Sequence, residues 1–187
     1  PFYTWQDEKS FEARRLGFET TLNRRLNPGT NVFITNRFSR DTVRVKYEDD
    51  AERLDDFYNK SILLGGLRRN TTDQLFTPTR GVITNFTLEE AGLLFQSKFR
   101  YYKITGEYRI YHELAPRWIV AARILAGTMN TFGGSETTPV EERFFAGGSY
   151  SVRGWERQEL GPQRTDSKSG KRIPIGGNRR GRDAEGK

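Results

Sequence analysis

The side chains that could support catalysis or metal binding are few in this sequence. It has no Cys and a single His, His112, which excludes a disulfide framework and Cys-ligated zinc or iron–sulfur sites. One His also argues against a multi-His metal site or a Ser-His-Asp triad. The acid pairs Glu89-Glu90 and Glu141-Glu142 could supply a general acid and base. Neighbours on a strand point to opposite faces, and neither pair has a supporting His, so we expect no enzyme activity, no metal and no cofactor.

The charge balance does not identify a partner. The 187 residues carry a formal net charge of +7, which could indicate nucleic acid or a lipid surface. Part of the excess lies in the stretch Arg179-Arg180-Gly181-Arg182, which is typical of a solvated loop. No cluster of basic and aromatic residues resembles a nucleic-acid motif. We therefore expect no nucleic-acid partner.

Alternation of apolar and polar residues predicts β-strands. Between Phe99 and His112, the apolar residues Tyr102, Ile104, Tyr108 and Ile110 share one face with Gly106, which is the period of a strand. The same alternation appears over residues 15–23 and 82–89. The sequence thus predicts an all-β chain, with further strands at Asn31–Ser39 (with a continuation to Tyr47 as the alternative), Ser61–Asn70 and Trp118–Met129.

The connections between these strands alternate in length. Short turns are expected at Asn27–Gly29, Thr77–Gly81 and Leu114–Arg117, and longer connections at Arg40–Asn59 and from Asn130 onward. Outer-membrane barrels show this alternation, because their periplasmic turns are short and their extracellular loops long. A tilted strand of about ten residues spans the hydrocarbon layer, whereas a helix needs roughly 20 apolar residues. The pattern therefore favours an antiparallel transmembrane β-barrel.

Soluble β-sandwiches and lipocalin-like barrels also alternate, but they turn the apolar face inward. The density of charge on the opposite face, together with strand length, favours the membrane alternative here. In a membrane barrel the charged face lines the lumen. We expect four such residues to face the lumen: Lys103, Glu107, Arg109 and Arg123.

A motif within residues 139–162 (PVEERFFAGGSYSVRGWERQELGP) carries a family resemblance. It contains Phe144-Phe145, then Gly147-Gly148, then Val152-Arg153-Gly154-Trp155. This order closely resembles the sixth extracellular loop of the Omp85 superfamily of outer-membrane barrels (bacterial surface antigen D15 type), although that family has Phe or Tyr at the last position. The order and spacing of Thr72-Asp73, the turn 78–81 and the segment 173–178 agree with this resemblance.

The resemblance implies a role for the motif. In the family this loop folds back into the lumen, where its Arg meets acidic and aromatic groups of the inner wall. Arg153 would then lock the loop, because a guanidinium in a partly dehydrated lumen needs a carboxylate partner. Gly154 would permit a positive φ at the loop tip, and Trp155 would pack against the wall. Gly147-Gly148 would form the bend by which the chain re-enters the barrel.

The resemblance also implies how the chain is organised. The complete barrel would have about sixteen strands, so six to seven strands would be a fragment, since bacterial barrels begin at about eight. We expect barrel strands with short periplasmic turns over residues 1–129 and a long extracellular loop folding into the lumen over 130–172. Residues 173–187 would start the next strand or loop, and periplasmic POTRA repeats would lie upstream.

The function that the resemblance implies is outer-membrane protein assembly. Members of the BamA/TamA-like branch help fold and insert β-barrel proteins without a catalytic residue, by perturbing the bilayer and templating strands at an exposed seam. The alternatives are a two-partner secretion transporter of the same superfamily and, from another class, a passive pore or surface-antigen barrel.

The same resemblance implies the partners and the location. Expected partners are unfolded outer-membrane proteins, the lipid bilayer, and accessory lipoproteins or periplasmic partners bound through POTRA repeats. The expected location is the outer membrane of a Gram-negative bacterium, with an organelle outer membrane as the alternative.

Overall fold

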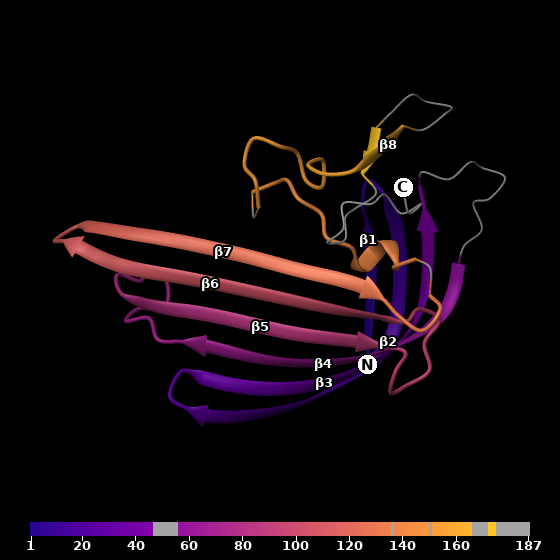
Figure 1. The fold of residues 1–187 in the computed structure, drawn as a ribbon, viewed down its shortest axis with the longest axis horizontal. Coiled ribbons are helices and arrows are strands. Elements are labelled where there is room, and N and C mark those ends of the chain that lie inside the picture. The colour runs from indigo at the N-terminus through magenta and orange to yellow at the C-terminus, as the bar shows by residue number, and fades with distance from the viewer. Residues whose placement is uncertain (47–55, 136, 150, 166–171, 175–187) are drawn as a thin grey trace.

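A computed structural model describes residues 1–46, 56–135, 137–149, 151–165 and 172–174. Its main element is one antiparallel sheet whose seven strands follow one another in chain order (Figure 1). A short 3-10 helix, η1 (Val140–Glu142), follows the sheet, and β8 (Gln163–Thr165) and β9 (Arg172–Pro174) form a separate ribbon. The seven strands are β1 (Phe2–Asp7), β2 (Phe11–Asn27), β3 (Thr30–Val45), β4 (Asp56–Asn70), β5 (Gly81–Ala91), β6 (Tyr101–Ala115) and β7 (Trp118–Thr131). No helix in the described part of the chain has the length and hydropathy needed to span a membrane.

The six strands predicted from alternation are all present, and the predicted all-β, antiparallel fold is confirmed. The structure adds β1, whose six residues pair with the start of β2 and are too few for their alternation to stand out. β3 continues to Val45, which agrees with the longer of the two predicted ends, and β4 begins at Asp56, so the connection is shorter than Arg40–Asn59. Because of this extension, Asp41 of β3 and Tyr58 of β4 pair with each other as part of the sheet.

The expected start of a further barrel strand at residues 173–187 is only partly described. Arg172–Pro174 pair with Gln163–Thr165 and not with the seven-stranded sheet. Residues 175–187, with the basic stretch 179–182, lie outside the described residues.

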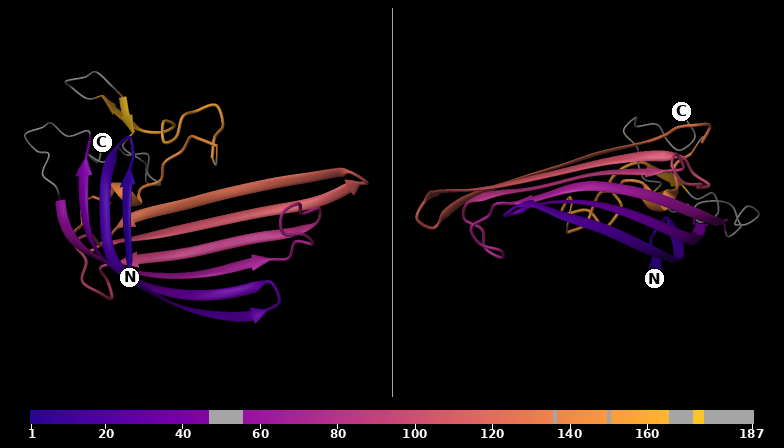
Figure 2. Two further views of the ribbon diagram at one scale, coloured as in Figure 1. Left: turned by 180° about the vertical axis from the view of Figure 1, so that it is seen from behind. Right: turned by 90° about the horizontal axis from the view of Figure 1, so that it is seen from below.

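The strands have an apolar face that is exposed and an opposite, more polar face, which is covered where the chain after β7 lies on it (Figure 2). Leu16, Phe18 and Leu22 of β2 are between 52% and 72% exposed, and the rings of Phe18 and Phe38 lie 5.7 Å apart. On the opposite face the hydroxyls of Thr21 and Thr35 are 2.8 Å apart. A soluble sandwich would bury the apolar face, so the exposed apolar face favours a surface that meets lipid.

The sheet is curved, and the chain after β7 lies on its concave side (Figure 2). Two buried apolar clusters lie at the end of the sheet that this segment covers, and Phe145 and Phe144 of the segment pack against one cluster each. The first cluster consists of Phe11, Ala13, Val43, Tyr58 and Val140, and the second of Ile62, Ala91, Tyr101 and Met129.

The predicted alternation of short and long connections holds only in part, because the β1–β2 connection has three residues at the end where the longer connections lie. Pro28-Gly29 and Pro116-Arg117 form two-residue turns at one end, where Gly29 has a φ of 85° that suits a tight turn. The chain after β7 and the connection 92–100 lie at the other end. One detail differs, because the β4–β5 connection spans Thr71–Arg80 and is not the tight turn predicted at Thr77–Gly81.

Asp73 organises this longer connection. Its carboxylate accepts hydrogen bonds from the backbone N–H groups of Thr79 (3.0 Å) and Arg80 (3.1 Å) and from the Thr79 hydroxyl (2.5 Å). The bonds from Thr79 and Arg80 lower the pKa of Asp73 to about 2, since they favour the ionised form. The Asp and the residues after Pro78 therefore form one local unit.

The lowered pKa of Asp73 predicts how this connection responds to acid. Its contribution is complete above the ordinary pKa of 3.8 and is lost as the pH falls from there toward about 2. Amide hydrogen exchange at Thr79 and Arg80, corrected for intrinsic rates, should show protection at pH 5 that is lost over this range. Asp73→Asn should show weak protection throughout; protection equal to that of the parent at pH 5 would contradict the role of the charge.

The two faces of β6 give a second prediction. In the full-length protein, nitroxide labels at Ile104 and Tyr108 should be accessible to oxygen dissolved in lipid. Labels at Thr105 and Glu107, which have the opposite parity, should be accessible to a water-soluble nickel complex. Electron paramagnetic resonance measures both, and reversed accessibility would indicate a soluble sheet with an apolar core.

Candidate functional site

Helix η1 brings two carboxylates to the concave side of the sheet. Lys60 Nζ of β4 donates to Glu141 Oε1 at 2.9 Å and to Glu142 Oε1 at 2.8 Å. Tyr58 Oη donates to Glu141 Oε1 at 2.5 Å. Lys103 Nζ of β6 donates to the backbone carbonyl of Glu142 at 2.8 Å. One helical turn thus fixes the chain after β7 to β4 and β6.

These contacts belong to a buried group of three cations and three carboxylates, which we call the ion cluster. Lys60 Nζ is also 2.9 Å from Asp41 Oδ2, and Arg15 lies 3.7 Å from Asp41 and 3.6 Å from Glu142. Lys60 is 1% exposed and Asp41 is fully buried. The members come from β2, β3, β4, β6 and η1: Arg15, Asp41, Lys60, Lys103, Glu141 and Glu142.

The balance of positive and negative charges offsets the cost of burying the ion cluster. Removing a charge from water costs several kcal/mol, which only opposite charges nearby can offset. Burial alone would raise the pKa of Glu142, but Lys60, Arg15 and Lys103 outweigh it and hold the pKa below its ordinary value. Asp41 Oδ1 and Glu141 Oε2 are buried without a hydrogen-bond donor among the described residues. The cluster therefore depends on its cations more than on complete hydrogen bonding.

Sequence reasoning missed this cluster, although one signal for it exists. Asp41 lies between Ser39 and Val43 on the inner face of β3, and all three are buried. Lys60 likewise lies between Tyr58 and Ile62 on β4. A charged residue flanked by apolar or small residues two positions away on one strand face marks a buried ion pair.

The aromatic pair of the motif bridges two parts of the curved sheet. Phe144 packs over Gly127 of β7, where a Cβ would lie 2.6 Å from the ring, and Lys103 Nζ lies 5.2 Å from the ring centroid. The ring of Phe145 lies 6.3 Å from that of Phe11 in β2. Two consecutive side chains therefore contact β7 and β2, which lie near opposite edges of the sheet.

The two glycines after the aromatic pair allow the chain to turn. Gly147 and Gly148 have φ values of 109° and 92°, which residues with a Cβ rarely adopt. Leu160 N–H then donates to Ala146 O at 3.0 Å, and Gly148 N–H donates to Trp155 O at 2.9 Å. The chain turns away after Ala146 and pairs with Ala146 again at Leu160. We call this stretch the excursion, and it carries Val152–Trp155.

The tip of this excursion is exposed. Val152 is 41% and Trp155 51% exposed, and Gly154 has a φ of 93°. Arg153 has no ion pair or hydrogen bond with any residue that the structure describes. Any acidic group that Arg153 binds must therefore lie elsewhere than in these residues.

Neighbours of the motif bind the short β1–β2 connection instead. Lys9 forms ion pairs with Glu156 and Glu159, and Arg157 Nη2 lies 2.5 Å from Glu8 Oε1. Lys9, Glu156 and Glu159 are 36–73% exposed, and exposed pairs contribute about 0–1 kcal/mol each. Arg157 is 73% exposed, whereas its partner Glu8 is only 8% exposed. Sequence reasoning missed these contacts, because nothing in the spacing relates residues so far apart.

The four residues predicted to face the lumen lie on one face but in two groups. Lys103 joins the ion cluster through Glu142. Farther along β6, Glu107 Oε1 accepts from Arg109 Nε and from Arg123 Nε, each at 2.7 Å. Arg123 lies opposite Arg109 on β7, so the shared carboxylate separates two like charges.

The acid pairs behave differently from each other. Glu89 accepts from Tyr101 Oη at 2.6 Å, whereas Glu90 accepts from the backbone N–H of Leu93, so these neighbours on β5 do point apart. The same expectation for Glu141 and Glu142 is wrong, because they lie on η1 and both bind Lys60. No group of three or more acidic or His side chains in the described residues could hold a metal ion.

The family comparison agrees with this combination of outward apolar strands and an inward loop. The model of the Omp85 superfamily domain matches residues 2–181. The chain therefore belongs to the Omp85 superfamily, and it is a segment of an outer-membrane β-barrel, as the motif predicted.

Two individual relatives have sequences similar to this chain. The chain is 35% identical over 115 residues to the outer membrane protein assembly factor BamA of Neisseria meningitidis, and 35% identical over 111 residues to that of Nitratidesulfovibrio vulgaris. These matches cover 62% and 59% of this chain but only 14% and 13% of the relatives.

A solved structure shows the same fold. The crystal structure of BamA from Haemophilus ducreyi lacking POTRA domains 1–3 matches with a TM-score of 0.79 and 20% identity. The match covers 94% of this chain and 38% of that one.

Loss of Lys60 should destabilise the full-length protein strongly. Lys60→Met leaves three buried carboxylates with two cations, so we expect the free energy of unfolding in urea to fall by about 3–5 kcal/mol. Adding Glu142→Gln should recover part of the loss, because it removes the excess negative charge.

The control is Arg37→Met, which removes a partly exposed ion pair between Arg37 and Glu19 (2.7 Å) on the same inner face. Its expected cost is about 0–1 kcal/mol. Equal losses in the two single variants would contradict the role of the buried charge.

Proposed function

We propose that this chain is a section of the barrel wall, with its lumenal loop, of a BamA-like outer-membrane protein assembly factor. One observation carries the proposal: the chain after β7 is seated on the concave face of a sheet whose other face is apolar and exposed. The relatives named assembly factors align with more than half of the chain, which supports the same function.

The role we propose is mechanical and involves no catalytic residue. The outward face of the strands holds the section in the bilayer, and the seated loop occupies the lumen. Unfolded outer-membrane proteins would be the substrates, and the full-length protein would supply the strand edge that templates them. Accessory lipoproteins or periplasmic partners bound through POTRA repeats would be further partners.

We further propose that residues 130–172 act as one lumenal loop with two attachments. The ion cluster and the aromatic pair would form the first, on the strands of this chain. Arg153 would form the second, by holding a carboxylate on another part of the inner wall, with Trp155 packed beside it. The exposure of Val152 and Trp155 supports this division, since large apolar side chains at a tip favour a covering surface.

A two-partner secretion transporter is the alternative within the superfamily. The number of POTRA repeats in the full-length protein distinguishes the two: by the family pattern, about two indicate a transporter and three or more an assembly factor.

Arg153 provides the test of the second attachment. In the full-length protein, Arg153→Ala should reduce the assembly of a porin substrate into its heat-resistant form by about 10- to 100-fold, because a charged hydrogen bond contributes ~1.5–3 kcal/mol. Arg153→Lys should restore little, since an ammonium cannot replace the bidentate guanidinium. Arg157→Ala, which removes the pair between the exposed Arg157 and Glu8 and leaves the motif intact, should have a small effect on assembly. Equal, negligible effects of Arg153→Ala and Arg157→Ala would rule out the lock.

A further inference from the structure

The outward face of the sheet carries a cation at the end where the two-residue turns lie. Lys60 of β4 is buried on the concave side, so the residues of opposite parity on β4 face outward, among them Gly65, Leu67 and Arg69. Arg69 is exposed, and β4 ends one residue later. Outer-membrane barrels have their short turns on the periplasmic side, which places Arg69 toward that side of the membrane.

The surroundings of Arg69 on this face contain no anion. Arg69 pairs with Thr30 of β3 and with Thr84 of β5, and Thr84 pairs with Tyr108 of β6. The residues two positions before and after these partners on their strands are not acidic either. The Arg69 side chain forms no ion pair or hydrogen bond with any residue that the structure describes. Strands of this chain flank Arg69 on both sides, so no further barrel strand lies next to it.

The side chains themselves mark where the apolar band of this face ends. On β2 the outward Leu22 is followed two positions later by Arg24, and on β4 Leu67 is followed by Arg69. Both arginines pair with residues of β3, which lies between these two strands. The change from apolar to cationic thus occurs at neighbouring points of two strands, independently of their tilt. A long cationic side chain at such a boundary extends its charge to the lipid headgroups.

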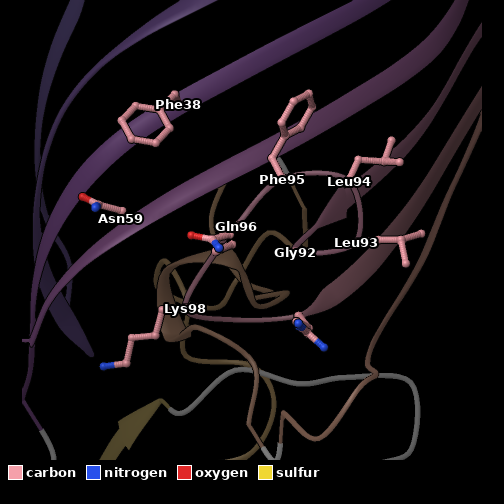
Figure 3. Close-up of a pocket in the computed structure, with 10 residues that line it drawn as sticks. Phe38, Asn59, Gly92, Leu93, Leu94, Phe95, Gln96 and Lys98 are labelled. Carbon is pink, nitrogen blue, oxygen red and sulfur yellow. The ribbon is translucent and has the colours of Figure 1, made fainter.

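Two cations at the opposite end of the sheet are engaged with the protein instead. A hollow of about 750 Å³ lies beside the β5–β6 connection, and Lys98 and Arg100 border it. Lys98 Nζ lies 5.3 Å from the ring centroid of Tyr58, and Figure 3 shows this side chain pointing away from Phe95. Arg100 Nη1 donates to the backbone carbonyl of Gly133 at 3.5 Å. The hollow therefore receives no charge from them, in contrast to the surface around Arg69.

The chemistry around Arg69 fits one class of lipid headgroup. A planar guanidinium binds two oxygens of a phosphate at once, and the hydroxyls of Thr84 and Tyr108 in the same row are further donors. A zwitterionic headgroup would also bring an ammonium group, for which this part of the face offers no carboxylate. Cations at a membrane surface attract anionic lipids, and Arg24 adds a second positive charge across β3.

From this combination we infer that Arg69 binds the phosphate of an anionic phospholipid in the periplasmic leaflet. The acyl chains lie along Leu67 and Phe86, which pair with each other on the same face. They also cover Gly65, where a Cβ would meet no atom within 4 Å. The inference goes beyond the proposed assembly function and depends only on the orientation of the sheet in the membrane.

The test uses the full-length protein in vesicles of phosphatidylcholine and phosphatidylglycerol, with the fluorophore NBD on Leu67→Cys. In separate samples, one of the two lipids carries a nitroxide on its acyl chain near the headgroup, which quenches NBD on contact. In the parent we expect phosphatidylglycerol to be enriched about fivefold over phosphatidylcholine at this position. Arg69→Gln should remove most of this enrichment, whereas Arg69→Lys should keep most of it because the charge remains.

The matched control is Arg68→Gln, which removes the same charge from the adjacent residue. Arg68 has the opposite parity, and its guanidinium lies 4.5 Å from the ring centroid of Phe33 on the inner face, so the enrichment should persist. Equal quenching by the two lipids in the parent, or equal losses in Arg68→Gln and Arg69→Gln, would overturn the inference. Heat-modified mobility on gels checks that each variant is folded. Porin assembly is not part of the readout, so failure here is distinguishable from failure of the proposed function.

Discussion

The ammonium group of Lys60 is the contact on which the concave side of this structure depends. It is almost fully buried and lies within 2.9 Å of carboxylates from β3 and from both acidic residues of η1. No single ion pair in the cluster would offset the cost of burying its charges. One ammonium shared by three carboxylates, with Arg15 and Lys103 at the edges of the cluster, offsets this cost. The two apolar clusters flank this centre and exclude water from it.

The arrangement explains why one curved sheet can be apolar outside and charged inside without losing stability. The outward apolar side chains need no protein partner, because lipid provides an apolar environment for them. The inward charges need partners, and these have two sources: the chain after β7, which brings Glu141 and Glu142 to Lys60, and neighbouring strands around Glu107. The loop is therefore a structural component of the wall as well as a candidate functional element.

Much of the fold could be predicted from the sequence, because period-2 alternation determines both the strands and their faces. The exposed positions of Leu16, Phe18 and Leu22 follow from parity alone. The ion cluster could not be predicted, since bringing Asp41, Lys60 and Glu142 together requires the register of three strands and the path of a loop. The acid pair on η1 was assigned to opposite faces because a strand was assumed there. The segment Leu93–Phe95 gave no periodic signal, being three apolar residues in a row.

The position of Glu142 has a consequence for how the chain folds. Its carboxylate meets Arg15 of β2, Lys60 of β4 and Lys103 of β6, residues that are adjacent in space only when the intervening strands are paired in register. A slip of one residue in any of these strands would turn its cation toward lipid. The contacts of Glu142 therefore form only when β2, β4 and β6 are all in their native register, and a slip in one strand would leave this buried carboxylate with one cation fewer.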